Sequence, residues 1–174
     1  ALLSRIEARP LQSAPGTQVL YSDLNYILLG DIVERVAGMP LDQFATQEIF
    51  APLAMHDTRF NPPRSLQARI APTIWAGLQL FKAPRPGRRR MLRAEASLQN
   101  VTLLQGIAGH AGLFSTADDL SIICQMMLRY GRHAGGRILS PLTFAAMTSD
   151  QLHATGASAD DDADEPYSVG TADQ

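Results

Sequence analysis

Residues 15–30 read PGTQVLYSDLNYILLG, a stretch that combines a turn signal with the beginning of a helix. The proline and glycine that open it favour a tight turn, and a short extended piece follows. Ser22 and Asp23 can each accept a backbone N–H at a helix start, and apolar side chains then recur at helical spacing. We therefore predict a helix over residues 24–37, which Gly38 ends.

Two further helices are predicted to begin at a proline. Pro40 stands at a first-turn position, and the apolar pattern that follows it continues until Pro52. The last predicted helix of the chain has Pro141 in its first turn. The side chains that we expect this last helix to bury are Leu142, Phe144 and Ala145.

The strongest helical pattern begins after Thr116. This residue and Ser115 offer a cap, and two aspartates in the first turn suit the positive end of the helix dipole. The side chains expected to form its buried stripe are Leu120, Ile123, Met126, Met127 and Tyr130. Outside the helices only residues 18–20 alternate strictly between polar and apolar, so no β-sheet is predicted.

The composition excludes several kinds of site. The 174 residues are 45% hydrophobic and 18% charged, which is the globular range. A single cysteine, Cys124, excludes a disulfide within the chain and a multi-cysteine zinc site, and the histidines lack metal-ligand spacing. No run approaches the roughly 18 apolar residues of a membrane span. We therefore expect no metal, no cofactor and no membrane span in this segment.

Two stretches differ in charge from the rest of the chain. Residues 82–93 contain six cations, two prolines and no acid, which is typical of a loop. A nucleic-acid patch is the alternative, but no aromatic side chains are interleaved, so we expect no nucleic acid as a partner. Residues 151–174 carry six acids and no lysine or arginine, which predicts an acidic, disordered tail, with an interaction tail as the alternative.

Two groups of polar residues could carry chemistry. Tyr21 and Asp23 flank a serine at a predicted helix start, where free N–H groups and the helix dipole favour anionic forms. Capping is the commoner role of such residues. The second group is residues 106–112, in which three glycines surround His110. That histidine could act as a general base or simply be hydrogen-bonded within a tight loop.

Five segments occur in an order that is typical of one family. They are residues 15–17 (PGT), 21–23 (YSD), 28–34 (LLGDIVE), 49–58 (IFAPLAMHDT) and 108–120 (AGHAGLFSTADDL). In order and spacing they resemble the serine β-lactamase-like family, which includes class C β-lactamases, penicillin-binding D,D-peptidases and related esterases. The resemblance implies an α+β fold, of which this chain would be a helix-rich partial segment that lacks most of the antiparallel sheet.

The resemblance also implies a reaction. Family members use a Ser-x-x-Lys serine for acyl transfer from an amide, β-lactam or ester, and a Tyr-x-Asn motif helps to move protons. Tyr21 would take this catalytic role, and Asp23 would bind substrate where the family usually has asparagine. An ionised aspartate only accepts hydrogen bonds, which weakens recognition of a penicillin side-chain amide. The resemblance puts His110, Ala111 and Gly112 at the substrate-binding rim of the cleft.

A single lysine limits what the chain itself can do. Among 15 basic residues only Lys82 is a lysine, with Gln79 three positions before it and Ala83 after it. Neither Ser-x-x-Lys nor the family's Lys-Thr-Gly motif is therefore present. We expect an internal fragment of a parent serine hydrolase that is inactive on its own. The alternative is a β-lactamase-like binding module without catalysis.

The expected organisation is one partial β-lactamase-like domain over residues 1–150, followed by the acidic tail. Within the domain, residues 82–105 depart from the family pattern, either as an atypical loop insertion or as a frame-shifted stretch. The resemblance implies a small-molecule or peptidoglycan-like substrate. It also allows a periplasmic or extracellular location, although the segment itself shows no signal peptide.

Overall fold

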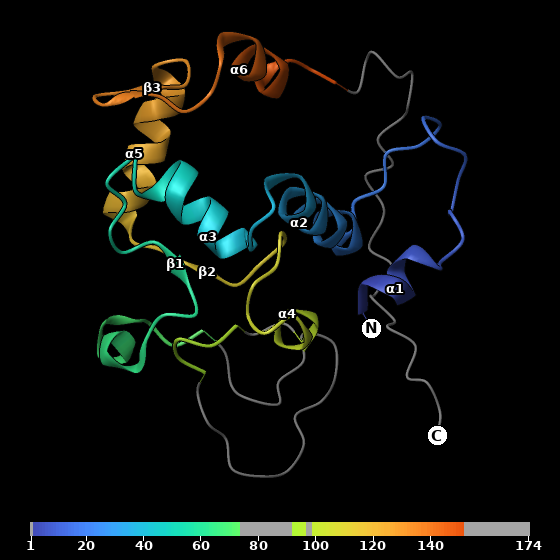
Figure 1. The fold of residues 1–174 in the computed structure, drawn as a ribbon, viewed down its shortest axis with the longest axis horizontal. Coiled ribbons are helices and arrows are strands. Elements are labelled where there is room, and N and C mark those ends of the chain that lie inside the picture. The colour runs from blue at the N-terminus through green and yellow to red at the C-terminus, as the bar shows by residue number, and fades with distance from the viewer. Residues whose placement is uncertain (1, 74–91, 97–98, 152–174) are drawn as a thin grey trace.

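The computed structural model describes residues 2–73, 92–96 and 99–151 of the chain (Figure 1). The predicted acidic tail beyond residue 151 and most of the arginine-rich run, residues 82–91, lie outside the described residues. The helices are α1 (Leu2–Glu7), α2 (Asp23–Ala37), α3 (Leu41–Ala45), a π-helical turn η1 (Thr46–Phe50), a 3₁₀ helix η2 (Arg64–Arg69), α4 (Gln99–Leu103), α5 (Ala117–Leu128) and α6 (Pro141–Thr148).

Helix α2 begins and ends where its sequence predicts, to within one residue. Ser22 Oγ accepts a hydrogen bond from the Leu24 N–H at 3.2 Å, which satisfies one of the donors that a first turn leaves unpaired. At the other end the Gly38 N–H donates to Glu34 O at 2.9 Å, and Gly38 has the left-handed cap conformation. The cap residues therefore define both ends of this helix.

The helix predicted over residues 40–52 changes its geometry halfway. Helix α3 gives way to η1, at the end of which the Ala51 N–H donates to Thr46 O at 2.8 Å. The hydrogen bond of a π-helical turn spans five residues instead of four. Ala45 and Phe50, five positions apart, are consequently both buried.

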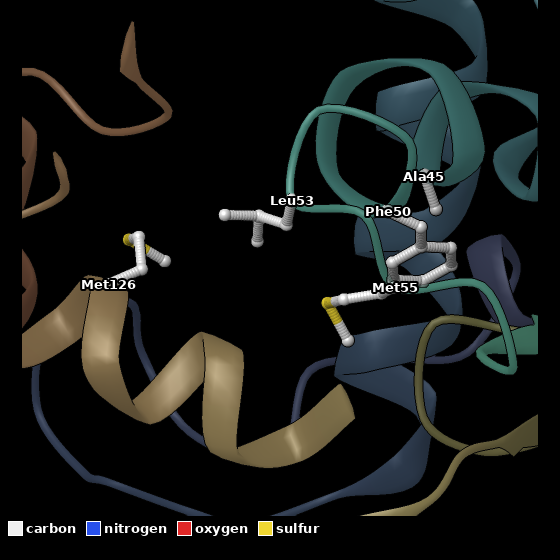
Figure 2. Close-up of a cluster of buried hydrophobic side chains, with 5 residues drawn as sticks. All are labelled: Ala45, Phe50, Leu53, Met55 and Met126. Atoms are coloured by element: carbon white, nitrogen blue, oxygen red, sulfur yellow. The ribbon is translucent and has the colours of Figure 1, made fainter. Parts of the chain in front are cut away.

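The hydrophobic core lies where α3, η1 and α5 meet. In Figure 1, α3 lies between α2 and α5, and Figure 2 shows the buried side chains that these segments and the turn after η1 contribute. They are Ala45, Phe50, Leu53, Met55 and Met126. Burying a large apolar side chain contributes roughly 1.5–3 kcal/mol. Because isolated helices of five residues are unstable in water, this packing and not helix propensity holds α3 in place.

The buried side of α5 differs from the predicted stripe. Thr116 caps the helix as expected, because its Oγ1 accepts a hydrogen bond from the Asp119 N–H at 3.2 Å. Met126 is buried, but Leu120 is 50% exposed and Tyr130 is exposed as well, so the predictions for these two residues are wrong. The carboxylate of Asp119 takes the inward position instead, since two hydrogen bonds hold it there.

Helix α6 begins as predicted but packs less than predicted. Pro141 stands in its first turn. Phe144 is half-buried against Tyr130, with the ring centroids 5.3 Å apart and the planes at 73°. The predictions for the other two side chains are wrong, since Leu142 is 84% exposed and Ala145 is exposed too. Within the described part of the chain nothing covers that side of the helix.

Two small sheets appear that the sequence did not predict. Strand β1 (Arg59–Phe60) pairs antiparallel with β2 (Leu113–Phe114), and β3 (Arg132–His133) pairs antiparallel with β4 (Gly136–Arg137). Strands of two residues are too short to show an alternating pattern. The described residues thus form a helix-rich α+β structure, as expected.

Helix α4 lies in the segment that departs from the family pattern, and sequence reasoning did not find it. Its Val101 is fully buried. The Gly106 N–H donates to Val101 O at 2.9 Å, which turns the chain directly after the helix. Helix α4 therefore leads straight into the glycine-rich loop at residues 106–112.

Candidate active site

Tyr21 lies immediately before the first turn of α2. Its side chain is 72% exposed, and its ring lies beside that of Tyr26, with the centroids 5.9 Å apart and the planes at 51°. Two local hydrogen bonds set the course of the backbone here. They are the Ser22 cap and a bond of 3.3 Å from Asn25 Nδ2 to Leu20 O. The sequence thus presents an exposed phenol at a well-defined helix start.

The glycine-rich loop packs directly against α2. A Cβ atom added at Gly109 would lie 2.2 Å from Tyr26 O, which is far below a van der Waals contact. A Cβ atom added at Gly30 would in turn lie 3.2 Å from the Gly109 N atom. Backbone therefore meets backbone at this point, and only glycine permits the close approach.

The same loop is closed on itself at its far end. Gly112 has a φ of 106°, and an added Cβ there would lie 2.3 Å from Gly106 O. Ala108 and Ala111 form an isolated antiparallel bridge between these two glycines. The loop is thus tightly folded. Within it, His110 lies near Asp23 of α2, whereas Ala111 lines a pocket.

His110 is enclosed between the loop and α2. Its side chain is 1% exposed, and its Nε2 lies 4.0 Å from Asp23 Oδ2. Burial lowers the pKa of His110, and the nearby Asp23 carboxylate raises it by a smaller amount. The structure therefore brings together two predicted site residues that stand 87 positions apart (110 minus 23).

A pocket of about 510 Å³ opens on the other side of the loop. It lies between residues 57–73, 92–96 and 111–116. Ala111 and Gly112 line it, whereas Tyr21, Asp23 and His110 do not. The predicted site residues therefore form two groups, one at the start of α2 and one at the pocket, which the glycine-rich loop connects.

Sequence reasoning missed an ion pair that shapes this pocket. Arg69 donates to both carboxylate oxygens of Asp57, at 3.0 and 2.7 Å, and lowers the pKa of that carboxyl. Both residues line the pocket, together with Thr73, Ser115 and Thr116. The spacing of Asp57 and Arg69 matches no local motif, so the sequence offered no signal for this pair.

The described residues contain no group of three or more His, Cys, Asp or Glu side chains that could hold a metal ion. None of the helices they form has the length and apolar character that a membrane crossing requires.

The described residues form a helix-rich part of an α+β fold. The chain belongs to the beta-lactamase family, whose model matches residues 1–174. This is a family of serine hydrolases that act in general on small-molecule and peptide substrates. The resemblance found in the sequence is thereby confirmed.

Two curated relatives illustrate the similarity. The N-acetylmuramyl-L-alanine amidase of Bacillus subtilis is 38% identical over 132 residues, which are 71% of this chain and 29% of that protein. A Salmonella schwarzengrund protein with the provisional name D-alanyl-D-alanine carboxypeptidase is 32% identical over 84% of this chain and 35% of its own. The chain therefore spans about a third of the length of these relatives.

Solved structures agree on the fold. The penicillin-binding protein of Bacillus halodurans aligns with a TM-score of 0.60 and 18% identity, over 87% of this chain and 42% of that one. EstCE1, described as a hydrolase with promiscuous acyltransferase activity, aligns with a TM-score of 0.56 and 26% identity, over 80% and 36%. The expected fold class, a partial segment of the β-lactamase/transpeptidase-like fold, is thus confirmed.

Proposed function

We propose that this chain contributes the tyrosine side of a serine-hydrolase site that performs acyl transfer on an amide, β-lactam or ester. The position of Tyr21 carries the proposal. Its exposed ring lies just before the capped first turn of α2, two residues before Asp23, and the glycine-rich loop packs onto the same helix. Tyr21, as the proton-transfer group, and the glycine-rich loop, as the segment that faces the substrate, would then lie against the same helix.

In this proposal Tyr21 moves the proton that acyl transfer requires. The phenolate form of Tyr21 accepts the proton of the attacking serine hydroxyl, and the resulting phenol returns it to the leaving group, while the serine forms the acyl-enzyme. The N–H groups of the first turn of α2 favour the negatively charged phenolate. Since the 174 residues contain no Ser-x-x-Lys, the nucleophile would come from outside them.

The proposed substrate-binding side consists of Asp23, Ala111 and Gly112, with His110 acting through Asp23. The family's asparagine both donates and accepts hydrogen bonds, whereas an ionised aspartate only accepts them. Substrates that present an N–H or ammonium group beside Tyr21 are therefore favoured. Small amides and peptidoglycan-like peptides fit this requirement.

A β-lactamase-like binding module without catalysis is the second candidate. One observation favours it, namely the aspartate at position 23, where family members usually have asparagine. This candidate predicts that the product of the full reading frame binds a ligand of the family without turning it over. The two candidates therefore differ in whether substrate turnover is measured.

The test compares the 174-residue chain with the product of its full reading frame. Hydrolysis of nitrocefin and p-nitrophenyl acetate is measured for both, with Tyr21→Phe as the variant and Tyr26→Phe as its matched control. We expect no turnover by the chain alone. Where the reading frame supplies Ser-x-x-Lys, we expect turnover that Tyr21→Phe lowers by about 10²–10⁴-fold.

Three outcomes would contradict parts of this proposal. Turnover by the chain alone that is lost in Tyr21→Phe would show that the nucleophile lies within the 174 residues. A full-length Tyr21→Phe protein with the activity of Tyr26→Phe would remove Tyr21 from the mechanism. A reading frame without Ser-x-x-Lys that still binds a fluorescent penicillin would favour the binding module.

A further inference from the structure

Both ring nitrogens of His110 are buried and lack a hydrogen-bond partner among the described residues. The side chain as a whole is almost completely buried. A neutral imidazole always carries one donor and one acceptor nitrogen. Because buried polar groups are normally hydrogen-bonded, two unpartnered nitrogens on one ring make it necessary to ask which nearby group could serve as a partner.

The nearest charged acceptor is the carboxylate of Asp23. Its Oδ2 lies 4.0 Å from His110 Nε2, about 1 Å beyond the usual N–H···O distance. Asp23 belongs to the first turn of α2 and stands two residues after Tyr21. A small rotation of the aspartate side chain would therefore complete a hydrogen bond directly beside the proposed catalytic tyrosine.

The histidine itself has little freedom to move. Gly109 meets the backbone of α2, and Gly112 closes the loop against Gly106. The loop thus holds His110 in place from both sides. An adjustment that shortens the distance would therefore involve the Asp23 side chain, whose backbone lies in the first turn of α2.

We propose that His110 is a positioning residue, which donates its Nε2–H to Asp23 and thereby orients that carboxylate beside Tyr21. This inference rests on the function proposed above for the same site. It gives the buried ring a donor role that needs no contact with substrate. It also links Ala111 and Gly112, which follow His110 in the loop, to the helix that carries Tyr21.

The charges around the ring are consistent with this role. Burial lowers the pKa of His110 by more than Asp23 raises it, so the ring is neutral near pH 7 and Nε2 can carry the single proton. Asp23 is then the acceptor in its ionised form. A neutral donor and an anionic acceptor make a stronger hydrogen bond than two neutral groups.

The first experiment measures the coupling without any substrate. The pKa of His110 is determined by NMR titration of its ring Cε1–H signal in the wild-type chain, in Asp23→Asn and in Asp118→Asn. Asp118 is the matched control, because it is an exposed acid in the first turn of α5. We expect Asp23→Asn to lower the pKa of His110 further and Asp118→Asn to leave it unchanged.

The second experiment separates donation from packing. His110→Gln keeps an N–H donor, whereas His110→Leu fills similar space without one. We expect the backbone amide signals of residues 21–23 to shift in His110→Leu and to return toward the wild-type positions in His110→Gln. If His110 only packs, the amide signals of His110→Leu should instead lie nearer to the wild-type positions than those of His110→Gln.

Two results would overturn the inference. One is a pKa of His110 that does not change in Asp23→Asn, and the other is a glutamine variant whose signals differ from wild type as much as those of leucine. Neither measurement involves turnover. If Tyr21→Phe proves harmless to activity, the function proposed for Tyr21 fails while the contact between His110 and Asp23 is still measured directly.

Discussion

Thr58 Oγ1 donates a hydrogen bond of 2.8 Å to Asp119 Oδ2, across 61 residues of sequence, and both side chains are buried. The Asp57 N–H donates to the same oxygen at 2.9 Å, and Ser115 Oγ lies 2.7 Å from Thr58 Oγ1. The link joins the segment before β1 to the first turn of α5. Two of the sequence segments that suggested the family, residues 49–58 and 108–120, are therefore held together by one carboxylate.

Removing this carboxylate should destabilise the chain. We expect Asp119→Ala to lower the free energy of unfolding by about 2–3 kcal/mol, because it removes the carboxylate that accepts from both the Thr58 hydroxyl and the Asp57 N–H. Urea unfolding followed by circular dichroism measures the loss. Asp118→Ala is the control, and its exposed position limits the expected loss to less than about 1 kcal/mol. Equal losses for the two variants would contradict the importance of the buried link.

The close approach of the loop to α2 should not tolerate a methyl group. We expect Gly109→Ala to lower the free energy of unfolding by about 1–3 kcal/mol, since its Cβ would lie 2.2 Å from Tyr26 O. Gly135→Ala is the matched control, because its Cβ would meet only the movable His133 ring, at 3.0 Å. The comparison needs only urea midpoints. A Gly109→Ala chain as stable as the control would disprove the tight packing.

The buried His110 should make stability depend on pH. The folded chain holds the pKa of His110 below the value of about 6.5 found in unfolded chains, so the unfolded state binds more protons between these two values. This contribution to stability is complete above about pH 7 and is lost progressively as the pH falls from about 6.5 toward the lower pKa that His110 has in the folded chain. Urea unfolding from pH 7.5 to 5.5 should therefore show a weaker decline in His110→Gln than in wild type. His56→Gln, at an exposed position, is the control. Parallel curves for wild type and His110→Gln would rule out this linkage.

The two faces of α5 should respond differently to truncation. We expect Met126→Ala to cost about 2–5 kcal/mol of stability, because its side chain completes the core cluster. Leu120→Ala should cost far less, since Leu120 is half exposed in spite of its place in the predicted stripe. Thermal and urea unfolding of the two variants distinguish the alternatives. A larger loss of stability in Leu120→Ala than in Met126→Ala would instead support the buried stripe that the sequence predicts.

Helix boundaries were predictable because their causes are local. Ser22 and Thr116 bond to N–H groups within three residues, and Gly38 needs only its own backbone conformation to end α2. The inward face of α5 was not predictable to the same degree. Its orientation depends on Thr58, which no reading of residues 117–128 alone can include.

The candidate site divides in the same way. The order of the sequence motifs singled out Tyr21, Asp23 and the loop around His110, and the roles assigned to these residues stay predictions. The sequence did not reveal that His110 is buried near Asp23, or that Ala111 lines a pocket to which His110 does not contribute. Both facts follow from the contact between Gly109 and α2, which is a long-range contact of the backbone.

The sequence by itself determined the family, the capped helices and the lack of a Ser-x-x-Lys motif, because each depends on residue identity and short spacing. Only the tertiary structure decided which side of α5 is buried, where the small sheets form and which site residues meet. The physical reason is that burial and hydrogen bonding between distant segments depend on how the chain packs. The link between Thr58 and Asp119 and the approach of His110 to Asp23 both arise from that packing.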